Sequence, residues 1–324
     1  MENILVSIHC TTYNHEKYIE DAIESFLMQQ TNFKYEIIIH DDASTDSTAD
    51  IIRAYQRKYP DIIKPILQKE NQRSKGVSVT KLNMKRAKGK YIAFCEGDDY
   101  WTHPQKLQKQ VDYMENNPDC SLCVHAGYIV FSLDKKLVSY NRPNKGNNVF
   151  TVEEVIEGGG GLFLTNTILF STKFSQNRPA FFDVSPVGDY PLVINLSLLG
   201  TVHYIDEYMS AYRVGVGGSW TANYLSTIEK KKTHFEEIAI MLDEINKYTN
   251  YQYEDTITRT KSRNQFNLLL EQRLFKEAKT GEFRELYTKL GVKRKIIIFI
   301  NQYYPRVADY LKLIKRKWFI WAMK

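Results

Sequence analysis

Three short polar segments of the sequence carry side chains that suit an anionic ligand and a cation. Residues 11–14 (Thr-Thr-Tyr-Asn) supply hydroxyl and amide groups, and residues 41–46 contain three aspartates among small capping residues. Residues 96–99 place three carboxylates within four positions, and these repel one another unless a cation lies among them. Hard oxygen ligands of this kind suit Mg²⁺ or Mn²⁺, with substrate phosphates completing the coordination. These residue types therefore favour a site for a metal and a phosphorylated ligand.

Each polar segment comes directly after an apolar run that is typical of a buried strand. The predicted strands are residues 4–10, 35–40, 65–68 and 91–95, and the predicted helices are 14–30, 45–59, 78–87 and 104–116. This alternation predicts an α/β fold with a mostly parallel sheet and helices on both faces. Such sheets bind ligands outside the carboxyl ends of their strands. We therefore expect the three polar segments to meet at one edge of the sheet.

Each segment also has an ordinary structural explanation when it is taken alone. Residues 11–14 and 41–46 resemble helix caps and turns, and the Asp98-Asp99 pair resembles a solvated turn. Their position after successive strands is what favours a binding site.

The order and spacing of these motifs resemble the family 2 glycosyltransferases. The resemblance is carried by residues 6–14, 39–46 and 89–101, is dense over residues 4–130 and is looser to about residue 222. Members of that family have the Rossmann-like GT-A fold and transfer sugars from nucleotide diphosphates with inversion. The resemblance therefore implies a GT-A domain followed by a C-terminal helical extension.

The resemblance also implies contacts to the nucleotide sugar. Thr11 and Tyr13 would contact the nucleotide, Asp42 would hydrogen-bond the base, and Lys75 lies in a loop that often reaches the nucleotide in this family. Arg213, in a glycine-rich segment that resembles a closing loop, would pair with phosphate.

A divalent metal, Mn²⁺ or Mg²⁺, is implied at the third motif. Asp98 would meet the ribose or the metal, and Asp99 would bind the metal and the diphosphate. Glu96 stands where many members have the first aspartate of this motif, and it preserves a carboxylate there.

Inverting transfer also needs a carboxylate base that accepts the proton of the acceptor hydroxyl. By resemblance this base lies well downstream, just before a buried helix. Asp189 fits, because it follows Gly188 and opens the apolar run at residues 192–199. The alternatives are that Asp189 only caps that helix or that Asp183 is the base.

The basic character of the chain is concentrated at its C-terminal end. Residues 293–324 carry nine basic residues against Asp309 alone, a local charge of +8, which leaves −2 of the total +6 for residues 1–292. A near-neutral body argues against a general nucleic-acid binder. We predict a GT-A domain over residues 1–222, a helical extension over 223–292 and a basic amphipathic tail over 293–324.

The tail has two interpretations. An apolar stripe flanked by lysines and an arginine is typical of a helix that lies on a membrane surface. The alternative is that the stripe packs on the helical extension or on a second copy of the chain in a homo-oligomer. The stripe consists of Val307, Leu311, Ile314, Trp318 and Trp321.

Together these patterns predict a metal-dependent inverting glycosyltransferase. We expect a UDP-sugar donor and a glycan or lipid-linked acceptor for bacterial surface polysaccharide. The four cysteines and the absence of a secretory signal in the first residues predict a cytoplasmic protein, peripheral at the inner face of the membrane. The alternatives are a non-catalytic scaffold subunit of a polysaccharide assembly complex and a nucleotidyltransferase.

Overall fold

The computed structural model describes residues 4–175, 178–217, 226–308 and 310. It divides into two compact units. Unit 1 consists of Met1–Pro179 and Val187–Val216, and unit 2 consists of Ala180–Pro186 and Gly217–Lys324. The domain boundaries expected at residues 222 and 292 stay predictions.

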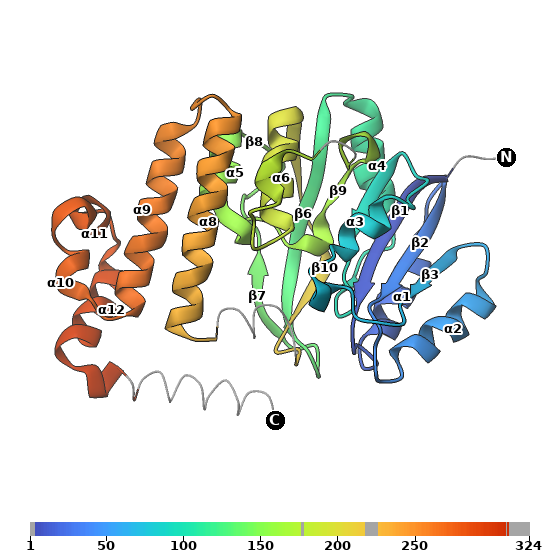
Figure 1. Cartoon of the computed structure of the whole chain (residues 1–324), viewed down its shortest axis with the longest axis horizontal. Coiled ribbons are helices and arrows are strands. Elements are labelled where there is room, and N and C mark those ends of the chain that lie inside the picture. The colour runs from blue at the N-terminus through green and yellow to red at the C-terminus, as the bar shows by residue number, and fades with distance from the viewer. Residues whose placement is uncertain (1–3, 176–177, 218–225, 309, 311–324) are drawn as a thin grey trace. The chain divides into compact units, whose positions relative to one another are not determined.

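Unit 1 is built on a mixed sheet with the strand order β3-β2-β1-β4-β9-β6-β10-β5. The first four strands in this order are parallel, and β1, β2 and β3 lie side by side in Figure 1. β9 is antiparallel to β4 and β6, whereas β6 and β10 are parallel to each other. Two further strands pair outside this order, β7 with β6 and β8 with β10. The strands are β1 Ile4–Thr12, β2 Lys34–Asp41, β3 Ile63–Leu67, β4 Tyr91–Phe94, β5 Tyr100–Trp101, β6 Cys120–Phe131, β7 Leu137–Asn141, β8 Asn148–Phe150, β9 Leu169–Ser171 and β10 Thr201–Val214.

Alternation along the strands sends apolar side chains to both faces of the sheet. On β2, Ile37 and Ile39 join the core that includes Ile23 of α1 and Ile52 of α2. His40 points to the other face, where its Nδ1 lies 2.9 Å from Oδ1 of Asn83 in α3. The helices of unit 1 are α1 Ile19–Leu27, α2 Thr48–Lys58, α3 Val79–Met84, α4 Lys106–Asn116, α5 Val152–Gly158 and α6 Asp189–Leu199. The predicted α/β class, with helices on both faces, is confirmed.

β9 and β10 position residues of the site. β9 has only three residues, because the preceding Thr165–Thr167 forms a 3-10 turn. β10 extends to Val214, so Arg213 is a strand residue with a fixed backbone.

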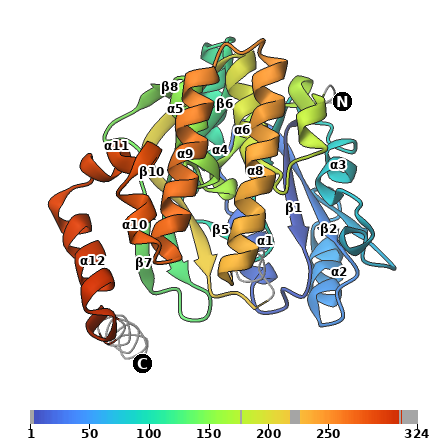
Figure 2. The same cartoon turned by 60° about the vertical axis from the view of Figure 1, so that its left-hand side comes forward.

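Unit 2 is helical in its described part. α8 and α9 lie side by side and antiparallel in both Figure 1 and Figure 2. The Lys261 ammonium of α9 lies 2.6 and 2.8 Å from the two carboxylate oxygens of Asp243 in α8. The helices are α8 Ile228–Tyr248, α9 Glu254–Glu271, α10 Phe275–Ala278, α11 Arg284–Thr288 and α12 Val292–Tyr303.

The predicted tail is described only in part. α12 covers its beginning, whereas Leu311, Ile314, Trp318 and Trp321 lie outside the described residues. Across the residues that the structure describes, no helix combines the length and apolarity needed to cross a membrane.

Candidate active site

The three polar segments meet at the carboxyl ends of β1, β2 and β4. The Asp42 amide donates to the Thr12 carbonyl over 3.0 Å, and the Gly97 amide donates to the Thr11 carbonyl over 2.9 Å. A side chain at position 97 would place its Cβ 2.7 Å from the Thr12 side chain, so only glycine permits this approach. The sequence therefore brings the third motif directly against the first.

The loops after β1 and β2 hold each other through side chains. The Asn14 amide donates to Ser44 Oγ over 2.8 Å, and the Thr45 amide donates to Asn14 Oδ1 over 2.8 Å. Asn14 and Ala43 have positive φ angles of 55° and 62°, which marks two tight and specifically supported turns. These contacts fix the loop that presents Thr11, which is half-buried, and Tyr13, which is 44% exposed.

Asp42 is buried and holds a third loop in place. Its carboxylate accepts hydrogen bonds from the backbone amides of Gln72 (2.7 Å) and Arg73 (3.1 Å). In that loop Lys75 is exposed and pairs with Glu70. The base contact predicted for Asp42 and the nucleotide contact predicted for Lys75 stay predictions.

Three carboxylates gather outside the end of β4. Glu96 is accessible to solvent, yet the surrounding protein removes much of its hydration, and this raises its pKa to about 8. Repulsion from Asp98 and then from Asp189 also raises this pKa, and the Arg73 guanidinium opposes the rise. Glu96, Asp98 and Asp189 are thus within electrostatic reach of one another although Asp189 is distant in the sequence.

Asp99 points into the protein rather than toward this cluster. It is 1% exposed, and its carboxylate accepts hydrogen bonds from the Arg213 amide (2.8 Å) and from Asn166 Nδ2 (3.0 Å). Burial, together with Asp98 and Glu96, raises the pKa of Asp99 well above its usual value. The metal contact expected of Asp99 stays a prediction, and both of its oxygens already accept hydrogen bonds.

Asn166 is a buried residue of the site, in the segment 165–167 that the family resemblance implies to lie near the acceptor. Besides Asp99, its Nδ2 donates to the Ala211 carbonyl over 3.0 Å, and its Oδ1 accepts from Ser210 Oγ over 2.8 Å. The Asn166 carbonyl accepts from Trp101 Nε1 over 3.0 Å. Asn166 thereby connects the third motif with β10.

Asp189 opens α6, a helix that is apolar on all sides and mostly buried. Its carboxylate is half-buried, lies 3.3 Å from Thr165 Oγ1, and accepts from the Tyr190 amide over 2.8 Å. Burial raises the pKa of Asp189 above its usual value. Its competitor, Asp183, is exposed and belongs to unit 2. A raised pKa on a partly accessible carboxylate suits a proton acceptor.

Arg213 is fully buried and has partners within unit 1. Its guanidinium donates to the Asp98 carbonyl over 2.6 Å and pairs with Asp21. It also lies over the rings of Tyr100 (4.5 Å) and Tyr18 (5.3 Å). The phosphate contact predicted for Arg213 stays a prediction. Its observed contacts tie β10 and α1 to the third motif.

Two further side chains beside the cluster were not proposed from the sequence. His15 Nε2 lies 3.8 Å from Asp98 Oδ2, and burial lowers the pKa of this imidazole. Arg73 is exposed and close enough to Glu96 to lower that residue's pKa. The spacing of the histidines in the sequence does not indicate His15. The family resemblance implies a nucleotide contact for Lys75 in this loop and none for Arg73.

The donor atoms of the cluster suit a hard divalent cation. Glu96 and Asp98 offer carboxylate oxygens whose mutual repulsion a cation would relieve. In the described part of the chain, no group of three or more histidine, cysteine, aspartate or glutamate side chains is arranged so that it could hold a metal ion.

The sequence profile of Glycosyl transferase family 2 matches residues 7–170. The chain belongs to this family. Among its relatives is the Escherichia coli enzyme UDP-Glc:alpha-D-GlcNAc-diphosphoundecaprenol beta-1,3-glucosyltransferase WfaP, which is 30% identical over 244 residues, 73% of this chain and 87% of WfaP. An uncharacterised protein of Mycobacterium tuberculosis is 34% identical over 224 residues, 68% of this chain and 61% of that protein. The chain thus spans about three fifths of that relative.

Solved glycosyltransferases share the fold. The structure is similar to Staphylococcus aureus TarS 1–349 in complex with UDP-GlcNAc, with a TM-score of 0.57 and 18% identity over 92% of this chain and 79% of that one. It is also similar to the mannosyltransferase PcManGT of Pyrobaculum calidifontis in complex with GDP-Man and Mn²⁺, with a TM-score of 0.51 and 12% identity over 93% and 87% of the two chains. The family 2 resemblance predicted from the motifs is confirmed.

Proposed function

We propose that this family 2 glycosyltransferase transfers a sugar with inversion from a nucleotide diphosphate sugar to a glycan hydroxyl. The observation that carries the proposal is the gathering of Glu96, Asp98 and Asp189 at the carboxyl edge of the sheet. There, carboxylates that suit a cation lie within electrostatic reach of a carboxylate with a raised pKa.

Mn²⁺ or Mg²⁺ would be held by Glu96 and Asp98, with donor phosphates as further ligands. When bound, the metal would neutralise the charge that grows on the leaving diphosphate. Asp99 would reach the metal only after exchanging one of its two present hydrogen bonds. Its present contacts suit a second role, which is to hold the backbone of the third motif against β10.

Asp189 would accept the proton of the attacking acceptor hydroxyl. Because the reaction is a single displacement, the base must lie on the acceptor side of the anomeric carbon, opposite the diphosphate. The Thr165 hydroxyl beside Asp189 orients the carboxylate. Its raised pKa makes it a stronger base than an exposed aspartate.

The donor would lie over the loops after β1 and β2. Thr11 and Tyr13 would contact the nucleotide, Asp42 would bind the base, and Arg73 with Lys75 would supply positive charge for the diphosphate. UDP-sugars are favoured because TarS was solved with UDP-GlcNAc and WfaP is named for UDP-Glc.

The acceptor would be a glycan or lipid-linked glycan of bacterial surface polysaccharide. The name of WfaP, which describes a diphosphoundecaprenol-linked acceptor, supports this class. An exposed apolar surface on α12 (Ile296, Ile297, Phe299), next to basic residues 293–295, supports membrane contact through the tail at the inner face of the cell membrane.

The proposal is tested by incubating the full chain and Mn²⁺ with a panel of nucleotide sugars and membrane-extracted glycolipid acceptors. Release of nucleoside diphosphate with formation of a glycosidic bond of inverted configuration is expected. Pyrophosphate release from a nucleoside triphosphate would instead show a nucleotidyltransferase. No turnover with any donor would favour a scaffold role.

A further inference from the structure

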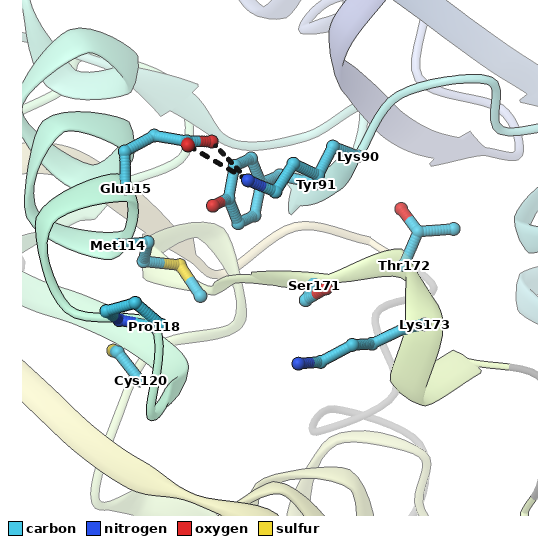
Figure 3. A pocket seen from close by; sticks show the side chains of 9 residues that line it. All are labelled: Lys90, Tyr91, Met114, Glu115, Pro118, Cys120, Ser171, Thr172 and Lys173. Atoms are coloured by element: carbon cyan, nitrogen blue, oxygen red, sulfur yellow. Dashed lines mark hydrogen bonds and ion pairs between the residues drawn. The ribbon is translucent and has the colours of Figure 1, made fainter.

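A cavity of about 410 Å³ lies at the amino ends of β4 and β6, the opposite edge of the sheet from the acidic cluster. Side chains from three elements line it: Met114 and Glu115 at the end of α4, Lys90 before β4, and Lys173 in the turn after β9. In Figure 3 the Lys173 side chain extends into the space between this turn and the segment that holds Pro118 and Cys120. The proposed donor site therefore does not include this cavity.

The segment leading into β4 is strongly basic. Residues 85–90 contain four lysines and arginines and no acidic residue. Lys85, Arg86, Lys88 and Lys90, which directly precede β4, are all exposed. Such a run raises the local concentration of anions at this edge.

Lys173 is brought next to this run by the backbone. The Thr172 amide donates to the Lys90 carbonyl over 2.8 Å, and the Thr172 hydroxyl donates to the Gly89 carbonyl over 2.7 Å. Side chains distant in the sequence thus share one small basic surface.

The two ammonium groups in the cavity differ in their partners. Lys90 Nζ lies 2.8 and 2.9 Å from the two carboxylate oxygens of Glu115 and is neutralised by them. Lys173 is exposed, and its Nζ lies 4.7 Å from the ring centroid of Phe174. Within the described residues no carboxylate pairs with Lys173. Its charge is therefore available to a ligand.

The wall that faces Lys173 is apolar. Met114 and Cys120 are 2% and 4% exposed, and Pro118 lies between them in the sequence. A cation on one side and an apolar wall on the other fit a molecule with an anionic head and an apolar part. A lysine is a compact point charge that suits phosphate without requiring planar geometry.

We propose that this cavity, with Lys173 as its cation, binds a phosphate group. The group belongs either to an anionic phospholipid in a bilayer or to a soluble phosphate monoester. The site lies at the opposite edge of the sheet from the proposed donor site, so it adds a second anion-binding region to unit 1.

The test compares Lys173→Ala with Lys58→Ala in the full chain. Lys58 is a matched control, because it is exposed and its Nζ lies 5.1 Å from the ring centroid of the following Tyr59. Cosedimentation is measured with vesicles of phosphatidylcholine alone and with phosphatidylglycerol added. Thermal shift is measured with glycerol 3-phosphate.

A loss of about fivefold in affinity for the anionic vesicles in Lys173→Ala, with no loss in Lys58→Ala, is expected for a lipid phosphate. A glycerol 3-phosphate shift that disappears only in Lys173→Ala supports a soluble phosphate monoester. Identical behaviour of the two variants in both measurements would overturn the proposal. Unchanged sugar transfer by Lys173→Ala would show that the variant is folded.

Discussion

The two edges of the sheet in unit 1 carry opposite charge and are held in different ways. At the carboxyl edge, acidic side chains are fixed by backbone donors, as Asp42 is by the amides of Gln72 and Arg73. At the amino edge, Lys85, Arg86 and Lys88 are exposed. One fold therefore supports a rigid acidic site at one end and an adaptable basic surface at the other.

This difference suits the roles proposed for the two edges. A metal and a reacting sugar need donors within a fraction of an ångström of their productive positions, so the acids are built into turns. A phosphate bound only by attraction tolerates long, mobile lysines. The net charge of −2 over residues 1–292 conceals this separation, because it sums the charges of both edges.

The largest effect is expected from removing the base at the acidic edge. Asp189→Asn should lower kcat about a thousandfold, because the amide cannot accept the proton of the acceptor hydroxyl. Nucleotide-sugar binding, measured by calorimetry, should persist. The control is Asp183→Asn, which should retain activity. If Asp183→Asn lost activity and Asp189→Asn kept it, the two residues would exchange roles.

The rigidity of the acidic edge is tested at Asn166. Asn166→Ala should lower the free energy of unfolding by about 2 kcal/mol, because Asp99 and the Ala211 carbonyl each lose a buried donor. Chemical denaturation measures this. Asn116→Ala, which removes one exposed hydrogen bond to the Asp112 carbonyl, should change stability by less than about 0.5 kcal/mol. Equal losses in both variants would show that Asn166 does not support the edge.

Comparing Arg73 with Lys75 tests which side chain supplies positive charge for the donor diphosphate at the acidic edge. Arg73→Ala should raise the KM for the donor about tenfold, since a charge-assisted contact to the diphosphate is lost. Lys75→Ala should change KM less, because Lys75 pairs with Glu70. Steady-state kinetics at fixed Mn²⁺ separate them. A larger effect at Lys75 would reverse the assignment.

We expect the buried interior between the two edges to disfavour a charged side chain. His9 is buried, and burial, with repulsion from His40, lowers its pKa to about 3, against 6.5 for an unperturbed histidine. Below pH 6.5, His9 binds a proton in the unfolded chain but stays neutral in the folded protein. The free energy of unfolding therefore falls as the pH falls toward 3. His9→Gln should make this slope shallower by about 1.4 kcal/mol per pH unit between pH 6 and pH 4. Denaturation at several pH values measures it, and parallel slopes would contradict the prediction.

The sequence could predict the parallel strands and the meeting of their loops, because both follow from alternation of apolar runs and from one geometric rule. It could not predict which carboxylates face outward. Asp98 and Asp99 are adjacent, yet only contacts from the distant Asn166 and Arg213 turn Asp99 inward. Nor could it pair Arg213 with Asp21, since 192 residues separate them.

The basic edge was missed for a related reason. Lys173 lies far along the chain from Lys88 and Lys90, and it joins them only through the antiparallel pairing of β9 with β4. The basic count at the C-terminal end of the sequence was more conspicuous. Counting charges along the sequence therefore indicates the basic tail, but it does not indicate a basic surface that forms only when the sheet brings distant residues together.

The central claim is that Glu96 and Asp98 at the acidic edge bind a nucleotide diphosphate through a divalent metal. Calorimetric titration of UDP and of GDP into the full chain, with and without Mn²⁺, tests it most directly. A Glu96→Gln/Asp98→Asn double variant is compared with Asp50→Asn/Asp61→Asn, which makes the same charge change at exposed positions. The account predicts Mn²⁺-dependent binding of one nucleotide that is lost only in the first double variant. Nucleotide binding that is equally strong without Mn²⁺, or in the Glu96→Gln/Asp98→Asn variant, would contradict the claim.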